Sequence, residues 1–292
     1  MNADDFEHIQ YERPVDGVAR IVMARPHVRN AQGLRMTYEL NHAFDLAVDD
    51  ADVRAIILAG EDPHFSAGHD LSDPGGDDFA RVGTWGDYWS GGAAGRFSHE
   101  MEIYLGMCER WRNLSKPTLA LVQGKCIAGG LMLAWACDLI IASDDASFRD
   151  PTIDMGVMGA EFFMHPWELG VRQAKEFLFT TEWLPAQQAR ELGMVNRVVP
   201  REQLQSAGLD LAEAIARKPE FAVRSAKLAI NQAQDLMGRW HAMRHSFALH
   251  HLTHAHNELK FGVPTDPRGT SARVGEKMLD ANRAHVQRAA GR

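Results

Sequence analysis

Two short glycine-containing stretches decide the fold of this chain: HFSAGHDL at residues 64–71 and QGKCIAGG at residues 123–130. The first follows the apolar run AIILA at residues 55–59, and the second follows TLALV at residues 118–122. Short apolar runs rich in strand-forming residues are typical of buried strands, so each loop is expected where a strand ends. The residues after Gly130 continue without a helix breaker and predict a buried helix.

Loops at two neighbouring strand ends can direct free backbone N–H groups toward one point. A helix N-terminus beside one of them adds positive potential there. Such an arrangement stabilises an oxygen that becomes negatively charged during a reaction. Either stretch alone is a weak signal, because glycine-rich turns are common. The two stretches together predict a site for an oxyanion.

Composition narrows the class of protein. The chain has 292 residues, which fits one large domain or a core with a small appendage. Its net charge of −8 opposes a nucleic-acid surface, which needs a basic patch. Cys108, Cys126 and Cys137 stand among apolar residues and predict reduced core thiols. With no signal-like start and no apolar stretch of membrane length, we expect a cytoplasmic protein that contacts no membrane.

Strand and helix signals alternate along the chain, which predicts an α/β fold with parallel strands and right-handed crossovers. A hairpin is expected around Asp16-Gly17. The predicted strands span residues 7–11, 17–24, 53–59, 118–122 and 138–142, and the predicted helices span 33–50, 100–114 and a segment from 129.

Four further stretches extend the pattern: RPHVRNA at 25–31, SKPT at 115–118, CDLIIA at 137–142 and PAQQARELGMVN at 185–196. With the two loops, and in the same order, they resemble the enoyl-CoA hydratase/isomerase (crotonase) superfamily. The resemblance implies the ClpP-like spiral of strand–strand–helix repeats. It further implies a spiral core over residues 1–200 and a helical C-terminal region and tail over 201–292 that forms a homotrimer or a dimer of trimers (a hexamer).

The resemblance also implies chemistry on a CoA thioester. The backbone N–H groups of His69 and Gly129 match the family's oxyanion hole, while the His69 imidazole is expected to be a pocket wall. Coenzyme A is then part of the acyl-CoA substrate, and no separate cofactor is expected. By position, the resemblance assigns substrate binding to Arg29, Ala67, Gly68, Asp70 and Leu71, although a surface arginine at a turn is the simpler interpretation of Arg29.

Two glutamates that hydratases of this family use are replaced here. One position, three residues past the oxyanion glycine, is Met132, and the other, after Pro151, is Thr152. A thioether transfers no proton, and a threonine hydroxyl is a poor base at neutral pH. Both residues are expected to contact substrate, but the two-glutamate hydration mechanism is not expected to operate.

Two other carboxylates are the candidate acid/base. Glu161 lies in a turn and helix start that faces the acyl pocket in the family, between Ala160 and Phe162-Phe163, where desolvation would raise its pKa. The alternative is helix-terminus charge complementarity or a salt bridge to Arg149 or Arg172. Asp154 is the second candidate because strand alternation puts it on the side of Thr152. Asp150 and His165 follow behind these two.

Residues 72–95 form a glycine-rich stretch with interleaved aromatic residues, including Gly75, Gly76, Trp85 and Trp89. Exposed tryptophans are unfavourable, so protein or ligand is expected to cover them. The stretch is interpreted either as a lid over a bulky acyl group, contacted by Trp85 and Trp89, or as trimer packing.

The C-terminal region is rich in histidine. The pairs His241/His245 and His250/His254 have the i,i+4 spacing that can bind zinc on a helix. The family uses no metal, so these histidines are predicted to be polar positions of an amphipathic helix, and no metal is expected. The tail from Ala272 is predicted to reach a neighbouring subunit, and Lys260 and Phe261 are loose candidates for a CoA contact.

These observations predict an enoyl-CoA hydratase/isomerase-like lyase or isomerase of fatty acid metabolism. Two alternatives remain: a hydrolase or C–C-cleaving enzyme on a bulky acyl-CoA, and a catalytically silent CoA-binding subunit. The sequence leaves the acyl group and the direction of the reaction open.

Overall fold

The computed structural model describes residues 5–73, 79–83, 85–270 and 272–290, so Gly75 and Gly76 lie outside the described residues. Its larger sheet has the strand order β1-β2-β3-β4-β6-β9. β1 and β2 form the predicted antiparallel hairpin, and every later neighbour in this sheet is parallel. The strands are β1 (Ile9–Val15), β2 (Val18–Met23), β3 (Ala55–Gly60), β4 (Thr118–Val122), β6 (Leu139–Ser143) and β9 (Arg197–Val199).

A smaller sheet has the order β5-β7-β8, formed by β5 (Lys125–Ile127), β7 (Ser147–Arg149) and β8 (Leu184–Pro185). A parallel bridge from Ser66 to Cys126 of β5 connects this sheet to the loop that follows β3, and a second bridge joins that loop, at His69, to Gln32. The first predicted glycine loop therefore lies beside the second, which contains β5.

Helices cover both faces of the larger sheet, and the strands supply apolar side chains to each face. Ile56 and Leu58 of β3 join a core cluster with Leu40 of α1 (Leu34–Asp49). Their neighbour Ile57 joins a second cluster with Leu204 of α8 (Leu204–Ala216). A strand buried on both faces reads as a continuous apolar run, which is why AIILA predicts it so well.

The predicted helix over residues 100–114 is the end of a longer helical rod. α2 (Gly92–Glu100) continues through a π-helical segment, η3 (Met101–Gly106), into α3 (Met107–Arg112). π-helical segments occur often at functional sites, and η3 supplies Ile103 and Tyr104 to the cavity described below.

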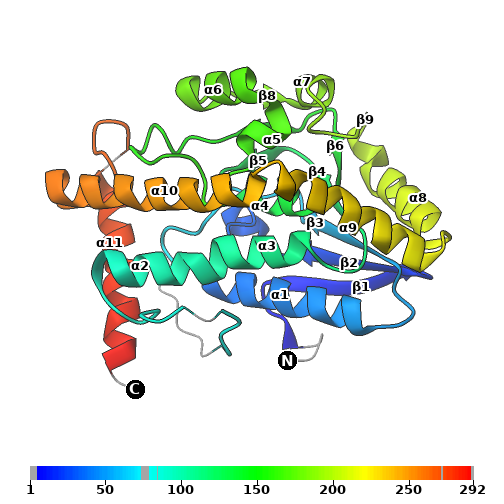
Figure 1. Ribbon diagram of the computed structural model, residues 1–292, viewed down its shortest axis with the longest axis horizontal. Coiled ribbons are helices and arrows are strands. Elements are labelled where there is room, and N and C mark those ends of the chain that lie inside the picture. Colours follow the sequence, from blue (N-terminus) through cyan, green and yellow to red (C-terminus); the bar gives the residue numbers. More distant parts are fainter. Residues whose placement is uncertain (1–4, 74–78, 84, 271, 291–292) are drawn as a thin grey trace.

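The remaining helices follow the strands in sequence. α10 runs alongside the rod formed by α2 and α3, and α11 crosses near the α2 end of that rod (Figure 1). The helices are α4 (Gly129–Ala136), α5 (His165–Leu169), α6 (Val171–Thr180), α7 (Ala186–Glu191), α9 (Glu220–Leu236), α10 (Arg239–Phe261) and α11 (Ala272–Ala290), with short 3-10 turns η2 (Pro26–Val28) and η4 (Arg201–Gln203). In the described part of the chain, no helix combines the length and apolarity needed to cross a bilayer.

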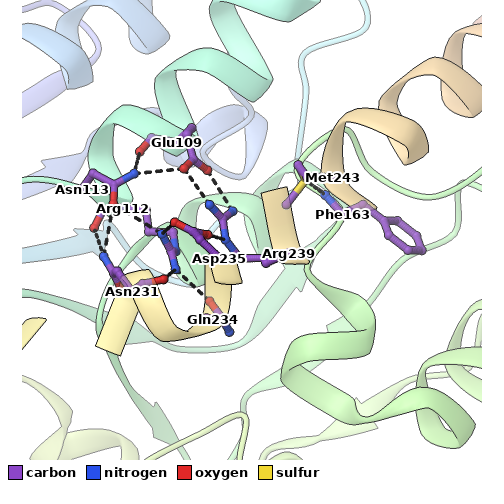
Figure 2. Close-up of polar contacts among 9 residues, drawn as sticks. All are labelled: Glu109, Arg112, Asn113, Phe163, Asn231, Gln234, Asp235, Arg239 and Met243. Atoms are coloured by element: carbon purple, nitrogen blue, oxygen red, sulfur yellow. Dashed lines mark hydrogen bonds and ion pairs between the residues drawn. The ribbon is translucent and has the colours of Figure 1, made fainter. Parts of the chain in front are cut away.

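A buried arginine joins the end of α9 to α3. Arg239 is fully buried; its guanidinium donates to both Glu109 carboxylate oxygens, at 2.6 and 2.8 Å, and to Asp235 at 2.5 Å. Arg112 donates to Gln234 Oε1 at 2.9 Å beside it (Figure 2). Because a buried charge is tolerated only when it is paired, this network fixes where α10 starts.

The prediction that the C-terminal tail reaches a neighbouring subunit stays a prediction. Within the chain, α11 packs back on the core, where Met278 and Ala281 line the cavity. Val286 lies against the stretch that precedes α2, 3.5 Å from where a side-chain carbon at Gly91 would be. An apolar helix side in reach of an apolar cavity buries surface within the chain, which explains this arrangement.

Candidate active site

Backbone hydrogen bonds bring the two glycine loops side by side. Ser66 N donates to the Lys125 carbonyl at 3.2 Å, and Ile127 N donates to the Ser66 carbonyl at 3.0 Å. Gln32 N donates to the Gly68 carbonyl at 2.8 Å on the other side. The loop after β3 is thus held between the early turn and the loop that leads into α4.

The close approach of the loops depends on glycine at two positions. A side-chain carbon at position 68 would lie 2.7 Å from the Ile127 carbonyl oxygen, and Gly68 has a φ of +88°. At position 129 it would lie 2.4 Å from Cδ2 of His69. Ala128 between them adopts φ 44° and ψ −106°. A non-glycine residue in that region is strained by about 1–3 kcal/mol, and such strain is common where a backbone group must be aimed.

The backbone nitrogens of His69 and Gly129 both lie near this junction. A side-chain carbon at position 129 would lie 3.2 Å from the His69 backbone N. Gly129 begins α4, and the first N–H groups of a helix have no partner within it. Neither N–H donates a backbone hydrogen bond in the described segments. This geometry can stabilise a negatively charged oxygen.

A cavity of about 370 Å³ opens at the junction. Of the residues predicted from the sequence, six line it: Ala67, His69, Asp70, Leu71, Thr152 and Glu161. Its other walls come from η3, α10 and α11, through residues such as Tyr104, His250 and Met278. A cavity of this size, largely apolar with a few polar groups, is typical of a small-molecule site.

The structure brings Glu161 to the cavity wall beside His69. Its Oε1 lies 3.6 Å from Nδ1 of His69 and 3.6 Å from Nε2 of His250. Burial raises the pKa of the Glu161 carboxyl, and the two imidazoles act against that shift. The predicted helix start is wrong, because α5 begins only at His165, and the charged partners are histidines rather than Arg149 or Arg172.

His69 is held flat against Tyr104. The two rings are stacked, with centroids 3.6 Å apart and planes 3° apart. With Nδ1 toward Glu161, the other ring nitrogen, Nε2, is buried and has no hydrogen-bond partner among the described residues. A carboxylate at one nitrogen and a free second nitrogen is the arrangement of an imidazole that can take a proton.

Glu100, His250 and His254 also line the cavity and were absent from the sequence prediction of the site. Burial acts to lower the pKa of His250, but the Glu161 and Glu100 carboxylates outweigh it and raise that pKa to about 9. Burial lowers the pKa of His254 to about 3. The i,i+4 spacing marked this histidine pair, but the sequence alone could not show that it faces inward beside Glu100.

Asp150 and His165 form a buried pair behind the cavity wall. Asp150 Oδ2 lies 2.9 Å from Nε2 of His165 and accepts from the Ala160 N–H at 3.0 Å. Its Oδ1 accepts from the Thr152 hydroxyl at 2.6 Å. Both side chains are fully buried, so they position the wall rather than contact substrate.

Other predicted residues lie away from the cavity. Asp154 accepts from Thr181 Oγ1 at 2.9 Å and pairs with Arg149 at 3.1 Å, so its geometry does not support an acid/base role. Met132 is buried in the core inside α4. The cavity walls also lack Gly129, although its neighbour Ala128 lines the cavity, and they lack Arg29, Gly68, Trp85, Trp89, Lys260 and Phe261. Trp85 is 42% exposed and packs edge-on against Phe97, and Trp89 packs against Tyr88, so the structure does not show the predicted lid contact.

Fold and site together define a crotonase-type α/β enzyme. The chain belongs to the enoyl-CoA hydratase/isomerase family, whose family model matches residues 14–265. A solved structure of a probable enoyl-CoA hydratase from Mycobacterium smegmatis is similar, at 42% identity and a TM-score of 0.81 over 89% of this chain and 99% of that one. An enoyl-CoA hydratase/isomerase from Xanthobacter autotrophicus Py2 is 30% identical, with a TM-score of 0.79 over 98% of each chain.

A third relative has a different activity in its name. 4-Chlorobenzoyl coenzyme A dehalogenase-2 from Arthrobacter sp is 32% identical over 75% of this chain and 76% of its own length. These relatives are named for different reactions of CoA thioesters. The chain is therefore an enzyme of the crotonase superfamily that acts on a CoA thioester.

Proposed function

We propose that the N–H groups of His69 and Gly129 bind the thioester oxygen of an acyl-CoA and that Glu161 is its single acid/base. The observation that carries this proposal is the position of Glu161, a buried cavity-lining carboxylate 3.6 Å from the His69 imidazole, which itself packs on Gly129. Only the His69 side chain separates this carboxylate from the proposed oxyanion site, so the carboxylate is within reach of an acyl chain in the cavity.

Double-bond isomerisation is the family reaction that one carboxylate can perform alone. Glu161 removes a proton from the α-carbon of a 3-enoyl-CoA, and the electron pair moves onto the thioester oxygen, where two N–H groups stabilise the enolate. As the enolate collapses, the double bond shifts and the γ-carbon takes the same proton back from Glu161. No atom is gained or lost. Hydration needs a second group, and Met132 and Thr152 supply no carboxylate.

A hydrolytic reaction on a bulky acyl-CoA is the second candidate. The unpartnered Nε2 of His69, with Glu161 behind Nδ1, supports it, because such an imidazole can activate water. The similarity to an Arthrobacter dehalogenase named for an aromatic acyl-CoA points in the same direction.

The first prediction concerns Glu161→Gln. Removing the only acid/base should lower the rate of 3-enoyl-CoA isomerisation about 100- to 10,000-fold, while the Kd for acyl-CoA changes little. Turnover measured by absorbance and binding measured by calorimetry check this. Asp154→Asn, outside the cavity, is the matched control and should leave both values unchanged.

Other outcomes distinguish the alternatives. Unchanged isomerisation in Glu161→Gln would remove Glu161 from the mechanism. Water-dependent release of CoA or halide by the wild type, lost in His69→Asn, would favour the hydrolytic candidate. Acyl-CoA binding without any turnover across a panel of thioesters would identify a catalytically silent subunit.

We also propose that the chain works as a homotrimer or dimer of trimers in the cytoplasm, on acyl-CoA thioesters of lipid metabolism. Exposed apolar side chains on α9 support the assembly.

A further inference from the structure

The Nε2 atoms of His250 and His254 face each other beside the Glu100 carboxylate. Nδ1 of His250 lies 2.8 Å from the Gly159 carbonyl oxygen, and Nδ1 of His254 lies 2.8 Å from the Pro264 carbonyl oxygen. A carbonyl only accepts hydrogen bonds, so each Nδ1 carries a proton and each Nε2 is left to interact with the other ring. These two Nε2 atoms are 3.1 Å apart.

At this distance the two nitrogens share either a proton or a bound cation. Glu100 adds negative charge at the same place, because its Oε2 is 3.6 Å from Nε2 of His250 and has no hydrogen-bond partner in the described structure. The three ligand atoms all lie within 4.8 Å of one another. Both imidazoles are at least nine-tenths buried, so bulk water does not supply the missing partner.

We propose that Glu100, His250 and His254 bind a divalent transition-metal ion, of which Zn²⁺ is the best match. Zn²⁺ takes imidazole nitrogen and carboxylate oxygen at about 2.0–2.2 Å, so neighbouring ligands of a tetrahedral ion lie about 3.3 Å apart. The observed separations of 3.1 and 3.6 Å bracket that value. Two histidines and one carboxylate are a common ligand set that leaves coordination positions open.

The surroundings have the features that support ligands of a metal. A backbone carbonyl at Nδ1 fixes the tautomer and orientation of each imidazole, as in known metal sites. His251 approaches the same carboxylate, with Nε2 at 3.3 Å from Glu100 Oε2. All three proposed ligands line the cavity, so a bound ion could there be reached by water or a substrate oxygen.

This site goes beyond the proposed function and does not depend on Glu161 acting as an acid/base. A proton shared between the two rings is the competing explanation. It would leave no place for a metal, so direct metal binding separates the two.

The experiment uses untagged full-length protein, stripped of metal and titrated with Zn²⁺ in a calorimeter. One saturable site per chain is expected. Glu100→Gln and His254→Gln should weaken binding by at least the ~10- to 100-fold typical of losing even an outer partner of a metal ligand. His241→Gln with His245→Gln is the matched control, because that pair has the same spacing on the same helix but is exposed.

A second measurement uses the wild type, so it still tests the proposal if a variant fails to fold. Zn²⁺ should shift the NMR signals of the Nε2 nitrogens of His250 and His254, and Co²⁺ should produce the visible absorption of a four-coordinate site. Absence of saturable binding, or Zn²⁺ shifts confined to exposed histidines, would overturn the proposal, as would binding that is unchanged in the ligand variants and lost in the control.

Discussion

Asp150 shows how one buried carboxylate holds the cavity wall in place. It accepts from His165, the Thr152 hydroxyl and the Ala160 N–H, and the next residue after Ala160 is Glu161. Burial alone would raise the pKa of Asp150, but the hydrogen bonds and charge of His165, with help from Thr152, keep it below its usual value. The ionised form is therefore the one that the fold stabilises.

A pH-dependent loss of stability follows from this shift. A carboxyl with a lowered pKa in the folded state contributes stability above its unfolded pKa of 3.8, and loses it as the pH falls through the lower folded value. Asp150→Asn should lower the free energy of unfolding at pH 7 by about 1–3 kcal/mol and flatten its decline below pH 4. Urea unfolding at several pH values measures both, with Asp144→Asn on an exposed turn as the control. A decline as steep as in the wild type would contradict it.

At this scale the sequence predicted the parts of the site that lie within motifs. The loop residues 67–71 and Glu161 sit in or next to recognisable stretches, whereas Glu100 does not. The two histidine pairs of α10 show the limit. They are nine residues apart, which at about 100° per residue puts them on opposite sides of the helix. Spacing thus predicts that one pair faces inward, but only the packing of α10 on α2 shows which.

Ion pairs of one buried arginine hold the junction of α9 and α10 in place. Arg239 is fully buried between Glu109 of α3 and Asp235 of α9. Arg239→Met should lower the free energy of unfolding by about 3–5 kcal/mol, because two carboxylates would then lose their buried partner. Denaturant unfolding measures the loss. Arg244→Met on the exposed side of α10 should have little effect, and an equal effect of both variants would argue against the network.

Elements were predicted well where local sequence decides them and poorly where tertiary contacts do. β3, β4 and β6 of the larger sheet follow from their apolar runs, since a strand buried on both faces has no polar alternation. The π-helical turn η3 and the inward packing of α11 have no such local signal. Both segments line the cavity, although η3 and α11 are far apart in the sequence.

At the scale of the whole molecule, α9 is a helix that packing within one chain leaves largely uncovered. It has no buried residue over its 17 positions. Its apolar side chains at Phe221, Leu228, Ile230 and Leu236 are 72%, 64%, 70% and 82% exposed. At about 100° per residue, Phe221, Leu228 and Leu236 fall on one side of the helix, and exposed apolar surface of this kind is typical of a protein–protein interface. Because the same helix is continuous with the Arg239 network, an interface there would also steady α10 and the cavity wall it supplies.

We predict that the apolar surface of α9 is buried against other copies of the chain. Light scattering after size-exclusion chromatography should give a mass of three or six chains, since closed rings of identical subunits satisfy a repeated apolar face. Leu228→Asp with Leu236→Asp should shift the protein to the monomer, because a charged carboxylate in an apolar interface loses its hydration. Asp144→Lys, a charge change on an exposed turn, should leave the mass unchanged. A wild type that is monomeric at micromolar concentration would contradict the assembly and leave α9 stable on its own.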